Sequence, residues 1–400
     1  MKHFLSLVYV AALALMLSAG ASAREITVDG MVFKTNRTAK IATFTKLAKP
    51  SDAKWKNQVT IPATVTDGDV KCSVTKIDAG ALYEHTTKAV SIPSTVTEIG
   101  NYAFYKTEFT EITLPSGLKT LGEGVFKDSK LQEVTIPASV TSIGDYAFSS
   151  PNFIKIAFKA RTANLTLGMG VFWHAGITSL TLPSTLTTVP NSAFGGNPEL
   201  TTVNFSRGLV SIEEGGFGNT GIKSLNLPAS LKTIGNIAFT LVKITELTLP
   251  GNVTTIGAKA FYDCPNLAKV NLPASVTSIG AQAFDECREI KFVASANPNP
   301  PVLGTDCFYW STYQNADLLL SSDAAIERYK VANEWKRFNW LANAGIGDVE
   351  ADAEVEPELP CTVYNLNGSF VTTCKADELD RLPSGVYIVR QGEKVSKICR

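Results

Sequence analysis

Histidine is rare in this sequence, with three copies in 400 residues. His3 lies in a predicted leader peptide, which leaves His85 and His174. Serine or cysteine nucleophiles need a histidine held by a partner, and neither of these two lies in a recognisable nucleophile motif. No cysteine pair has the spacing of zinc ligands, and the glycine-rich stretch 215–218 lacks the lysine of a phosphate-binding loop. The sequence predicts a protein that is not an enzyme, with no catalytic, cofactor-binding or metal residues and no cofactor. Glycosidase chemistry by carboxylates alone stays open.

Charge is also scarce, at 18% of the residues, and 37 basic residues are balanced by 37 acidic ones. Without a basic excess there is little to hold a phosphate backbone, so nucleic acid is not expected as a partner. The one long apolar run, residues 7–17, follows Lys2 and precedes Ala21-Ser22-Ala23. This pattern is typical of a signal peptide cleaved after Ala23, and the run is too short to span a bilayer. We expect an exported protein without a transmembrane segment; the alternative is a buried N-terminal strand or helix.

A phrase of about 22 residues dominates the rest of the chain and recurs ten times. One clear copy, residues 92–104, reads Ile-Pro-x-x-Val-x-x-Ile-Gly-x-x-Ala-Phe. A period this constant indicates a solenoid, in which each repeat packs against its neighbours. Spaced by 22 to 24 residues, the closing positions are Leu82, Phe104, Phe126, Phe148, Phe172, Phe194, Phe217, Phe239, Phe261 and Phe284.

Each repeat contains the parts of one coil. A short alternating run such as 180–182 directs its flanking residues inward and its middle residue outward. Proline then ends the strand, because it cannot donate the next ladder hydrogen bond. The glycine after the second apolar pair, as at Gly100 and Gly144, suits a turn with positive φ. We expect the closing phenylalanines to superpose in a column, each ring burying roughly 150–250 Å².

The full phrase, Leu-x-x-Leu-x-Leu-Pro-x-x-Leu-x-x-Ile-Gly-x-x-Ala-Phe, resembles the BspA-like leucine-rich repeat of bacterial cell-surface proteins. The resemblance covers about residues 25–341, and residues 26–33 and 299–336 are similar to that family's two ends. Copies at Phe158 and Phe205 lack the proline, so local irregularity is expected there. The resemblance implies a surface protein that attaches to host proteins or to other cells.

The composition changes after Leu341. Residues 347–358 include six acidic side chains and no basic one, which predicts an extended, solvated linker. Residues 361–400 are β-rich again, and Asn367-Gly368 is a strong hairpin-turn signal. This end resembles the C-terminal sorting domain of type IX secretion cargo, which implies placement at the cell surface or outer membrane, or secretion. The alternative is a small β module without a role in export.

We therefore predict a β-rich leucine-rich-repeat solenoid of about ten coils of 22–24 residues, capped at both ends and followed by a small β module. The predicted organisation is a signal peptide at 1–23, an N-terminal cap at 24–70, the solenoid at 71–310, a C-terminal cap at 311–342, an acidic linker at 343–360 and a sorting-like domain at 361–400.

Two of the seven cysteines, Cys264 and Cys287, each follow a closing phenylalanine by three residues. They therefore occupy one slot on adjacent coils. We interpret them as small buried apolar side chains, and a disulfide between them stays open as an alternative. Because seven is odd, at least one thiol is expected to remain unpaired within the monomer.

The remaining candidate for function is a surface. The outward middle positions of the first strands form an uncharged strip of hydroxyl and amide groups, which suits hydrogen bonding to a long partner. The alternative is that threonine is simply a good residue for an exposed strand. The candidate partner-binding residues are Ser91, Thr113, Thr135, Thr181, Asn204, Asn226, Thr248 and Asn271.

We expect a monomer that binds proteins, such as host extracellular-matrix or cell-surface proteins, or glycans. A structural surface component without a specific ligand is the alternative. Aromatic residues gather near the end of the repeats, at 308–310, Tyr313, Trp335 and Trp340. We expect them to cap the last coil rather than to bind a ligand.

Overall fold

The computed structural model places most of the chain. It describes residues 23–339, 360–365, 370–382, 386–391 and 394–399. Residues 1–22 of the predicted signal peptide and nearly all of the predicted acidic linker lie outside these residues. The chain divides into two units, Met1–Ile177 and Thr178–Arg400, and each is described by itself.

A single repeat forms one coil with two short strands. In β10 (Glu133–Ile136) the two apolar residues are buried and the two polar ones are exposed, as the alternating pattern predicts. Pro137 follows this strand directly, and β11 (Ser142–Ile143) lies further along the same coil. Strands of two to four residues have little stability alone, so they depend on pairing with the next coil.

The first unit begins with a capping sheet that leads into the coils. Strands β1 (Arg24–Val28), β2 (Met31–Asn36) and β3 (Ile41–Leu47) form an antiparallel meander. Strand β3 pairs in parallel with β6 (Val70–Ile77), which also pairs antiparallel with β5 (Thr64–Asp67). A short 3-10 helix, η2 (Ala53–Trp55), lies between β3 and the first repeat strands.

Two ladders of parallel strands follow in the first unit. The second strands continue from β6 in the order β8 (Glu98–Ile99), β9 (Thr120–Leu121), β11 and β13 (Thr166–Leu167). The first strands form two pairs, β4 (Val59–Thr60) with β7 (Val90–Ser91), and β10 with β12 (Lys155–Phe158).

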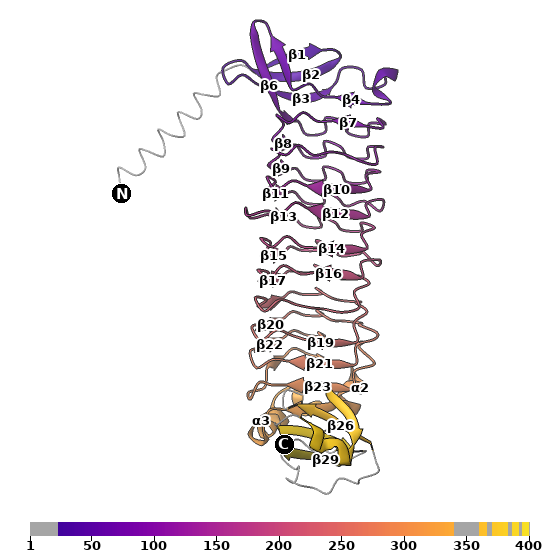
Figure 1. Ribbon diagram of the computed structural model, residues 1–400, viewed down its shortest axis with the longest axis vertical. Helices are drawn as coiled ribbons and strands as arrows, with labels where there is room; N and C mark the ends of the chain where they lie inside the picture. Colours follow the sequence, from indigo (N-terminus) through magenta and orange to yellow (C-terminus); the bar gives the residue numbers. More distant parts are fainter. Residues whose placement is uncertain (1–22, 340–359, 366–369, 383–385, 392–393, 400) are drawn as a thin grey trace, which may run out of the picture. The chain divides into compact units, whose positions relative to one another are not determined.

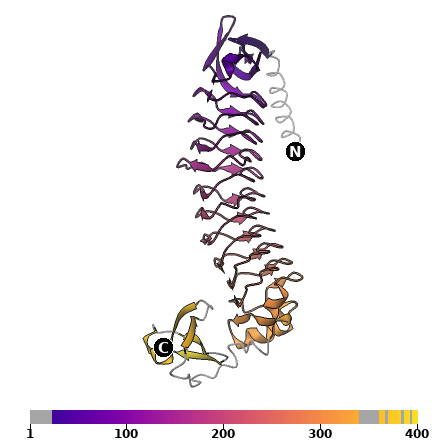
Figure 2. The same ribbon diagram turned by 90° about the vertical axis from the view of Figure 1, so that its right-hand side faces the viewer.

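The second unit repeats this arrangement. Figure 1 shows its strands in two columns, and Figure 2 shows the stacked coils from the side. Its second strands form a parallel sheet in the order β15 (Thr188–Val189), β17 (Ser211–Ile212), β18 (Thr233–Ile234), β20 (Thr255–Ile256), β22 (Ser278–Ile279) and β24 (Val302–Leu303). Its first strands form two sheets. In one, β14 (Ser179–Thr181) pairs with β16 (Thr202–Asn204); the other has the order β19 (Glu246–Thr248), β21 (Lys269–Leu272), β23 (Phe292–Ser295) and β25 (Asp317–Leu320). The predicted solenoid is therefore confirmed in both units.

Closing phenylalanines stack in a column within each unit, as predicted. Phe104, Phe126 and Phe148 have centroid separations of 5.3 Å from ring to ring. In the second unit, Phe239 lies 5.7 Å from Phe217 and 5.4 Å from Phe261, with interplanar angles of 6° and 11°. All of these rings are buried. The column forms the core of the stack.

The repeated glycine serves a different purpose from the one predicted. Gly100, Gly144 and Gly257 all lie in the described part of the chain, and none of them has a positive φ. A Cβ atom on Gly257 would instead lie 2.4 Å from the backbone nitrogen of Asn236 on the preceding coil. Glycine is needed at Gly257 because the adjacent coil approaches too closely there for a side chain. The prediction of a positive-φ turn at this slot is wrong.

Positive φ occurs instead two residues before and two residues after the closing phenylalanine. Around Phe104 these are Tyr102 at 55° and Lys106 at 50°; around Phe261 they are Lys259 at 55° and Asp263 at 51°. This arrangement turns alternate amide groups in the same direction. Tyr102, Phe104 and Lys106 all donate N–H hydrogen bonds of 2.7 to 3.0 Å to carbonyls of the following coil. The closing segment is thus a third ladder between coils, which we call the closing ladder.

The C-terminal cap ends the closing ladder with side chains. It comprises α2 (Trp310–Asn315), α3 (Asp323–Val331) and η3 (Trp335–Arg337). The N–H of Phe308 donates to the Tyr313 hydroxyl at 3.2 Å, and the N–H of Asp306 donates to Glu334 Oε2 at 3.1 Å. These oxygens replace the carbonyls of a following coil, which satisfies otherwise orphaned donors.

Aromatic packing completes this cap. Tyr313 and Trp335 are buried, and their rings lie 5.8 and 6.0 Å from that of Phe308. The expectation that these residues cap the last coil is confirmed. Trp310 differs, because it is 62% exposed, and Trp340 lies outside the described residues.

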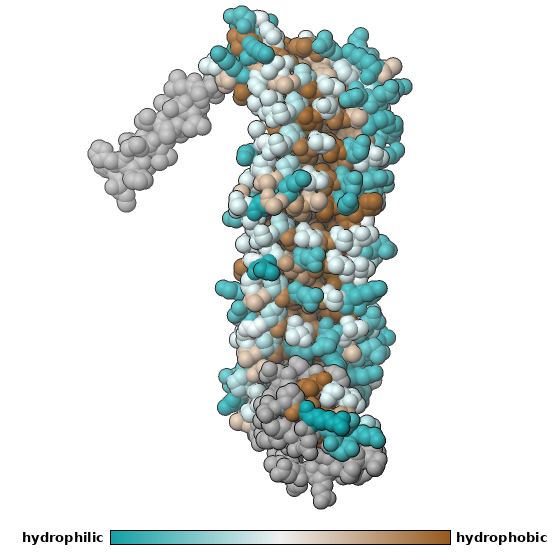
Figure 3. Space-filling view, in the orientation of Figure 1, coloured by the Kyte–Doolittle hydropathy of each residue, from teal (hydrophilic) through white to brown (hydrophobic). Residues whose placement is uncertain are grey.

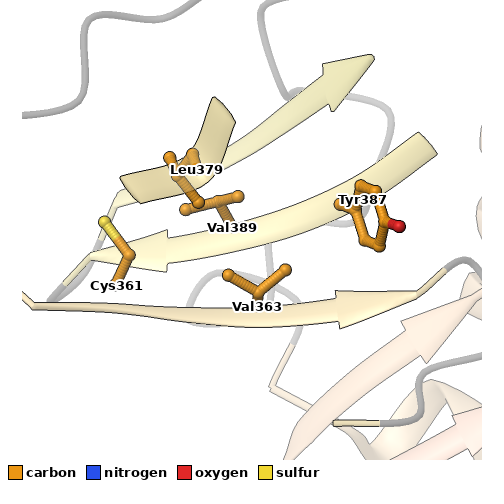
Figure 4. Packing of buried hydrophobic residues seen from close by; sticks show 5 residues of the cluster. All are labelled: Cys361, Val363, Leu379, Tyr387 and Val389. Atoms are coloured by element: carbon orange, nitrogen blue, oxygen red, sulfur yellow. The ribbon is translucent and has the colours of Figure 1, made fainter. Parts of the chain in front are cut away.

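The small C-terminal β module is present, as predicted. Its antiparallel order is β27 (Phe370–Lys375), β26 (Pro360–Asn365), β28 (Val386–Gln391) and β29 (Lys394–Cys399), with η5 (Ala376–Arg381) after β27. Strands β26 and β27 pair across the predicted hairpin, although Asn367-Gly368 lies outside the described residues. Figure 4 shows the core, formed by Cys361, Val363, Leu379, Tyr387 and Val389.

Candidate binding surfaces

The predicted strip of middle residues is largely exposed. In the first unit Ser91, Thr113 and Thr135 are exposed, and Ala157 occupies the next slot. Thr135 and Ala157 are directly paired in β10 and β12, so the slots of neighbouring coils lie side by side. The exposed members in the second unit are Thr181, Asn204, Asn226 and Thr248.

Asn271 departs from the expected outward position. It is only 8% exposed, and its Nδ2 donates to Thr248 Oγ1 at 3.0 Å and to Glu246 Oε1 at 3.2 Å. Its amide oxygen is buried without a hydrogen-bond partner. The expectation of an exposed side chain is wrong here, since alternation fixes the direction of a side chain and not what covers it.

Some members of the strip bond to one another along the stack. The side chain of Asn204 donates from Nδ2 to Thr181 Oγ1 at 3.1 Å, which joins two adjacent coils. Such cross-strand pairs stabilise a sheet by a few tenths of a kcal/mol up to about 1 kcal/mol. These two residues therefore have a structural role in the second unit, in addition to any role in binding.

A groove of about 1320 Å³ lies over the strip in the first unit. Ser91, Thr113 and Thr135 line it together with Pro115 and Pro137. Pockets for small molecules in proteins are usually about 300–1,000 Å³, so this groove suits a longer occupant. Figure 3 shows a band of hydrophobic residues flanked by hydrophilic ones on one face of the molecule.

Charged side chains give the groove an acidic and a basic part. Glu111 and Glu133 occupy the same slot on neighbouring coils. Lys155 follows in that slot and pairs with Glu133 at 3.3 Å, and Lys159 also lines the groove. Sequence reasoning missed these four residues because it considered only the middle position. The signal that was available for Glu111, Glu133 and Lys155 is the slot two residues before the middle position, which alternation also directs outward. Lys159 lies two residues after the middle position Ala157.

The two remaining histidines have structural surroundings. His85 is buried; its Nε2 lies 3.0 Å from the carbonyl oxygen of Pro50, and its Nδ1 accepts from the N–H of Thr87 at 3.1 Å. His174 has a φ of 50°, and its ring packs edge-on against Trp173 at 4.2 Å. Neither histidine is hydrogen-bonded to a candidate nucleophile in these contacts.

Cys264 and Cys287 occupy one slot on adjacent coils and are unbridged, buried thiols. Each donates its S–H to a backbone carbonyl, Cys264 to Phe239 and Cys287 to Phe261. The neighbouring Cys287 thiol raises the pKa of Cys264, and burial raises it further. Burial likewise raises the pKa of Cys307, which replaces the usual alanine before the closing Phe308. These thiols are therefore held in the protonated, unreactive form.

Two features are absent from the described residues. No three histidine, cysteine, aspartate or glutamate side chains there lie close enough to hold a metal ion. In the same part of the chain, no helix has the length and apolar character needed to cross a membrane.

Comparison with solved structures supports the fold. A leucine-rich repeat protein from Bacteroides ovatus is 22% identical, with a TM-score of 0.50 over 71% of this chain and 91% of that one. The pneumococcal vaccine antigen PcpA is 18% identical (TM-score 0.41, 77% of this chain and 96% of that one). A leucine rich cell surface protein from Faecalibacterium prausnitzii is 21% identical (TM-score 0.41, 74% and 89%). No match is found among curated proteins.

The sequence itself matches a family model over the repeats. The model describes the BspA type leucine rich repeat region, and it matches residues 75–196 and 165–291. Together these matches span residues 75–291, or 217 of 400 residues, which is more than half of the chain. With the coils, the phenylalanine columns and the caps described above, this match shows that the chain belongs to the BspA-type leucine-rich repeat family.

Proposed function

We propose that this is an exported surface protein that binds an extended protein partner through the groove of the first unit. The observation that carries the proposal is the coincidence of the groove with the strip of hydroxyl side chains at Ser91, Thr113 and Thr135. Hydroxyl groups donate and accept hydrogen bonds, so they suit the alternating N–H and C=O groups of an extended backbone. Solenoids commonly bind through such extended faces.

The charges in the groove favour one orientation of the partner. A partner segment with a basic residue over Glu111 and Glu133 and an acidic residue near Lys159 would complement both parts. Exposed charges of this kind contribute more to orientation and association rate than to affinity. The partner is proposed to be a host extracellular-matrix protein, a host cell-surface protein or a protein of another bacterium, which would make this an adhesion protein.

The test is a binding screen of the full chain against a panel of extracellular-matrix proteins by surface plasmon resonance. Thr135→Arg places a bulky charge in the groove, and we expect it to weaken binding about tenfold or more. Thr248→Arg is the matched control, since it changes the same slot in the second unit and should leave binding intact. Loss of binding with Thr181→Arg or Thr248→Arg alone would move the site to the second unit. No binding to any partner would favour the structural role.

Export and placement are part of the proposal. The sequence pattern of residues 1–23 supports cleavage after Ala23, and the β module supports a sorting role for residues 361–400. N-terminal sequencing of the mature protein should start at Arg24. Deletion of residues 361–400 should remove the protein from the cell surface, and unchanged surface exposure would refute the sorting role.

A further inference from the structure

Five aromatic side chains gather on the closing turns of the first unit, away from the segments that line the groove. Each occupies one of two positions in the repeat, either two residues before the closing position or one residue after it. We call them the aromatic track: Tyr83, Tyr102, Tyr105, Tyr146 and Trp173. Tyr83 and Trp173 are 52% and 42% exposed, and exposed rings that gather in one place are typical of a binding site.

The rings are arranged in two groups along the stack. Tyr83 stacks on Tyr105 with centroids 4.7 Å apart, and Tyr102 meets Tyr105 edge-on at 6.0 Å. Further along, Tyr146 meets Trp173 edge-on at 6.3 Å. Tyr105 and Trp173 lie three coils apart, which corresponds to roughly 15 Å at the usual strand spacing.

Glycines make room for two of these rings. A Cβ atom on Gly124 would lie 2.3 Å from the ring of Tyr102, and one on Gly170 would lie 2.4 Å from the ring of Tyr146. Both glycines have positive φ. They occupy the same repeat position, two residues before the closing phenylalanine, that Tyr102 and Tyr146 occupy on the preceding coils. Tyrosine and glycine therefore alternate along this slot, and each ring lies against the following coil.

Polar groups surround the rings but leave little net charge. Lys106 Nζ lies 5.1 Å from the Tyr105 ring centroid and pairs with Glu84 at 3.3 Å. Lys127 Nζ lies 5.4 Å from the centroid of Tyr146, and the hydroxyl of Tyr102 donates to Glu123. The track thus offers ring surfaces interrupted by hydrogen-bonding groups.

We infer that the aromatic track binds a neutral glycan chain. The apolar C–H face of a sugar ring stacks on an aromatic ring, while its hydroxyls reach carboxylates, ammonium groups and amides at the edge. A track of ring surfaces alternating with polar groups has this pattern. The core of a protein–protein interface is depleted in charged residues. In the track, Lys127 and Ser149 occupy the position after the closing phenylalanine on the two coils between Tyr105 and Trp173. A charged residue therefore interrupts the rings, which favours a glycan over a protein partner. The balanced charges select against an anionic glycan.

The track is confined to the first unit. The corresponding positions after the closing phenylalanine in the second unit begin with Gly195, Gly218 and Thr240, which provide no ring. Tyr262 and Tyr309 occupy this slot later, with Lys259 and Arg288 over their rings at 5.3 and 5.4 Å. Neither has an aromatic neighbour in the same slot on an adjacent coil, where Thr240 and Asp285 lie. Because the track lies on the closing turns and the groove lies over the first strands, glycan binding is a separate activity from the proposed protein binding, and each can fail alone.

The test is native affinity electrophoresis of the full chain in gels that contain mixed-linkage β-glucan, xyloglucan, galactomannan or α-mannan. We expect at least one polysaccharide to retard the protein. The double variant Tyr83→Ala/Trp173→Ala should weaken this retardation about tenfold or more, because it removes the two exposed rings of the track. Trp173→Phe should retain part of the binding, because it keeps a ring at that position.

Two controls separate the possible outcomes. Trp310→Ala removes an exposed ring outside the track and should bind like the unchanged protein, as should the groove variant Thr135→Arg. Absence of retardation in every gel would overturn the inference, and so would equal retardation of the double variant. If the double variant instead loses a protein partner and no polysaccharide is bound, the track is a protein interface and the inference is wrong.

Discussion

Replacing Phe239 with alanine should destabilise the second unit strongly. The ring is fully buried and lies between Phe217 and Phe261, with centroids 5.7 and 5.4 Å away. Removing a buried phenylalanine side chain costs about 3–5 kcal/mol through lost transfer energy and the cavity left behind. The two stacked contacts account for about 1–3 kcal/mol of this loss. The column is continuous here, so the coils on both sides of the cavity lose contacts.

Urea denaturation of the full chain, followed by far-ultraviolet circular dichroism, measures this effect. We expect a lower midpoint, or an early transition for the second unit if the stack loses its cooperativity. Trp310→Ala is the matched control, because it truncates an aromatic ring that is 62% exposed and should change the free energy of unfolding little. An unchanged midpoint for Phe239→Ala would refute the register of the coils and the assignment of their inward face.

Four further substitutions test the turns and the hydrogen bond of Tyr102. Gly257→Ala should destabilise the protein by roughly 1–3 kcal/mol or more, because its Cβ would lie 2.4 Å from the Asn236 nitrogen, whereas Gly251→Ala, with nothing within 4 Å, should be nearly neutral in the same denaturation assay. Ile237→Asn should stabilise by about 0.5–1 kcal/mol, since a β-branched residue at a φ of 46° is strained and asparagine tolerates this region; a lower midpoint would contradict this reasoning. The hydrogen bond to Glu123 raises the pKa of Tyr102 to about 12 from its usual 10.0. The stabilisation that this hydrogen bond gives the folded protein is therefore fully present below the pKa of the unfolded state, and it is lost as pH rises through the pKa of the folded state. The stability difference between the unchanged protein and Tyr102→Phe should therefore be constant from neutral pH up to pH 10 and shrink above it. A difference that does not change above pH 10 would contradict the assignment.

Much of the fold could be predicted from the sequence because the repeat imposes one register on every coil. Once Phe104, Phe126 and Phe148 are aligned, neighbouring strands must be parallel, and the residues that flank each strand's middle position must face inward. The column of rings follows from the same constraint. Propensity has little part in this inference, since strands such as β11 contain only two residues.

The conformation of the turns could not be predicted in this way. A lone glycine after an apolar pair is compatible with a positive-φ turn or with a close approach, and the sequence of one repeat does not distinguish them. Neighbouring coils decide the matter, because the closing ladder requires alternate amide groups to point the same way. Lys259 and Gln282 therefore adopt positive φ at 55° and 57°, although neither residue type favours it.

The candidate surfaces were only partly predictable for a related reason. Alternation identified Thr113 and Thr135 as outward, but it gave no information on the depth of the groove or on the burial of Asn271. The aromatic track lies in turns, where a period of two does not apply. Its signal in the sequence was the repeated tyrosine two residues before Phe104 and Phe148, which becomes visible only when the repeats are aligned on their closing position.

The direction of the closing ladder has a consequence for how such a protein changes length. Within each unit, the coils of the closing ladder present amide donors toward one end and carbonyl acceptors toward the other. The ladder itself therefore does not depend on which coil follows, although Tyr102 and Tyr146 each need a glycine in the same slot of the following coil. The last coil alone needs the hydroxyl of Tyr313 and the carboxylate of Glu334. Whole repeats can therefore be gained or lost by recombination within the array while the same terminal residues continue to seal it. A deletion of a fraction of a repeat would misalign the donors, so growth and shrinkage proceed in steps of one complete coil.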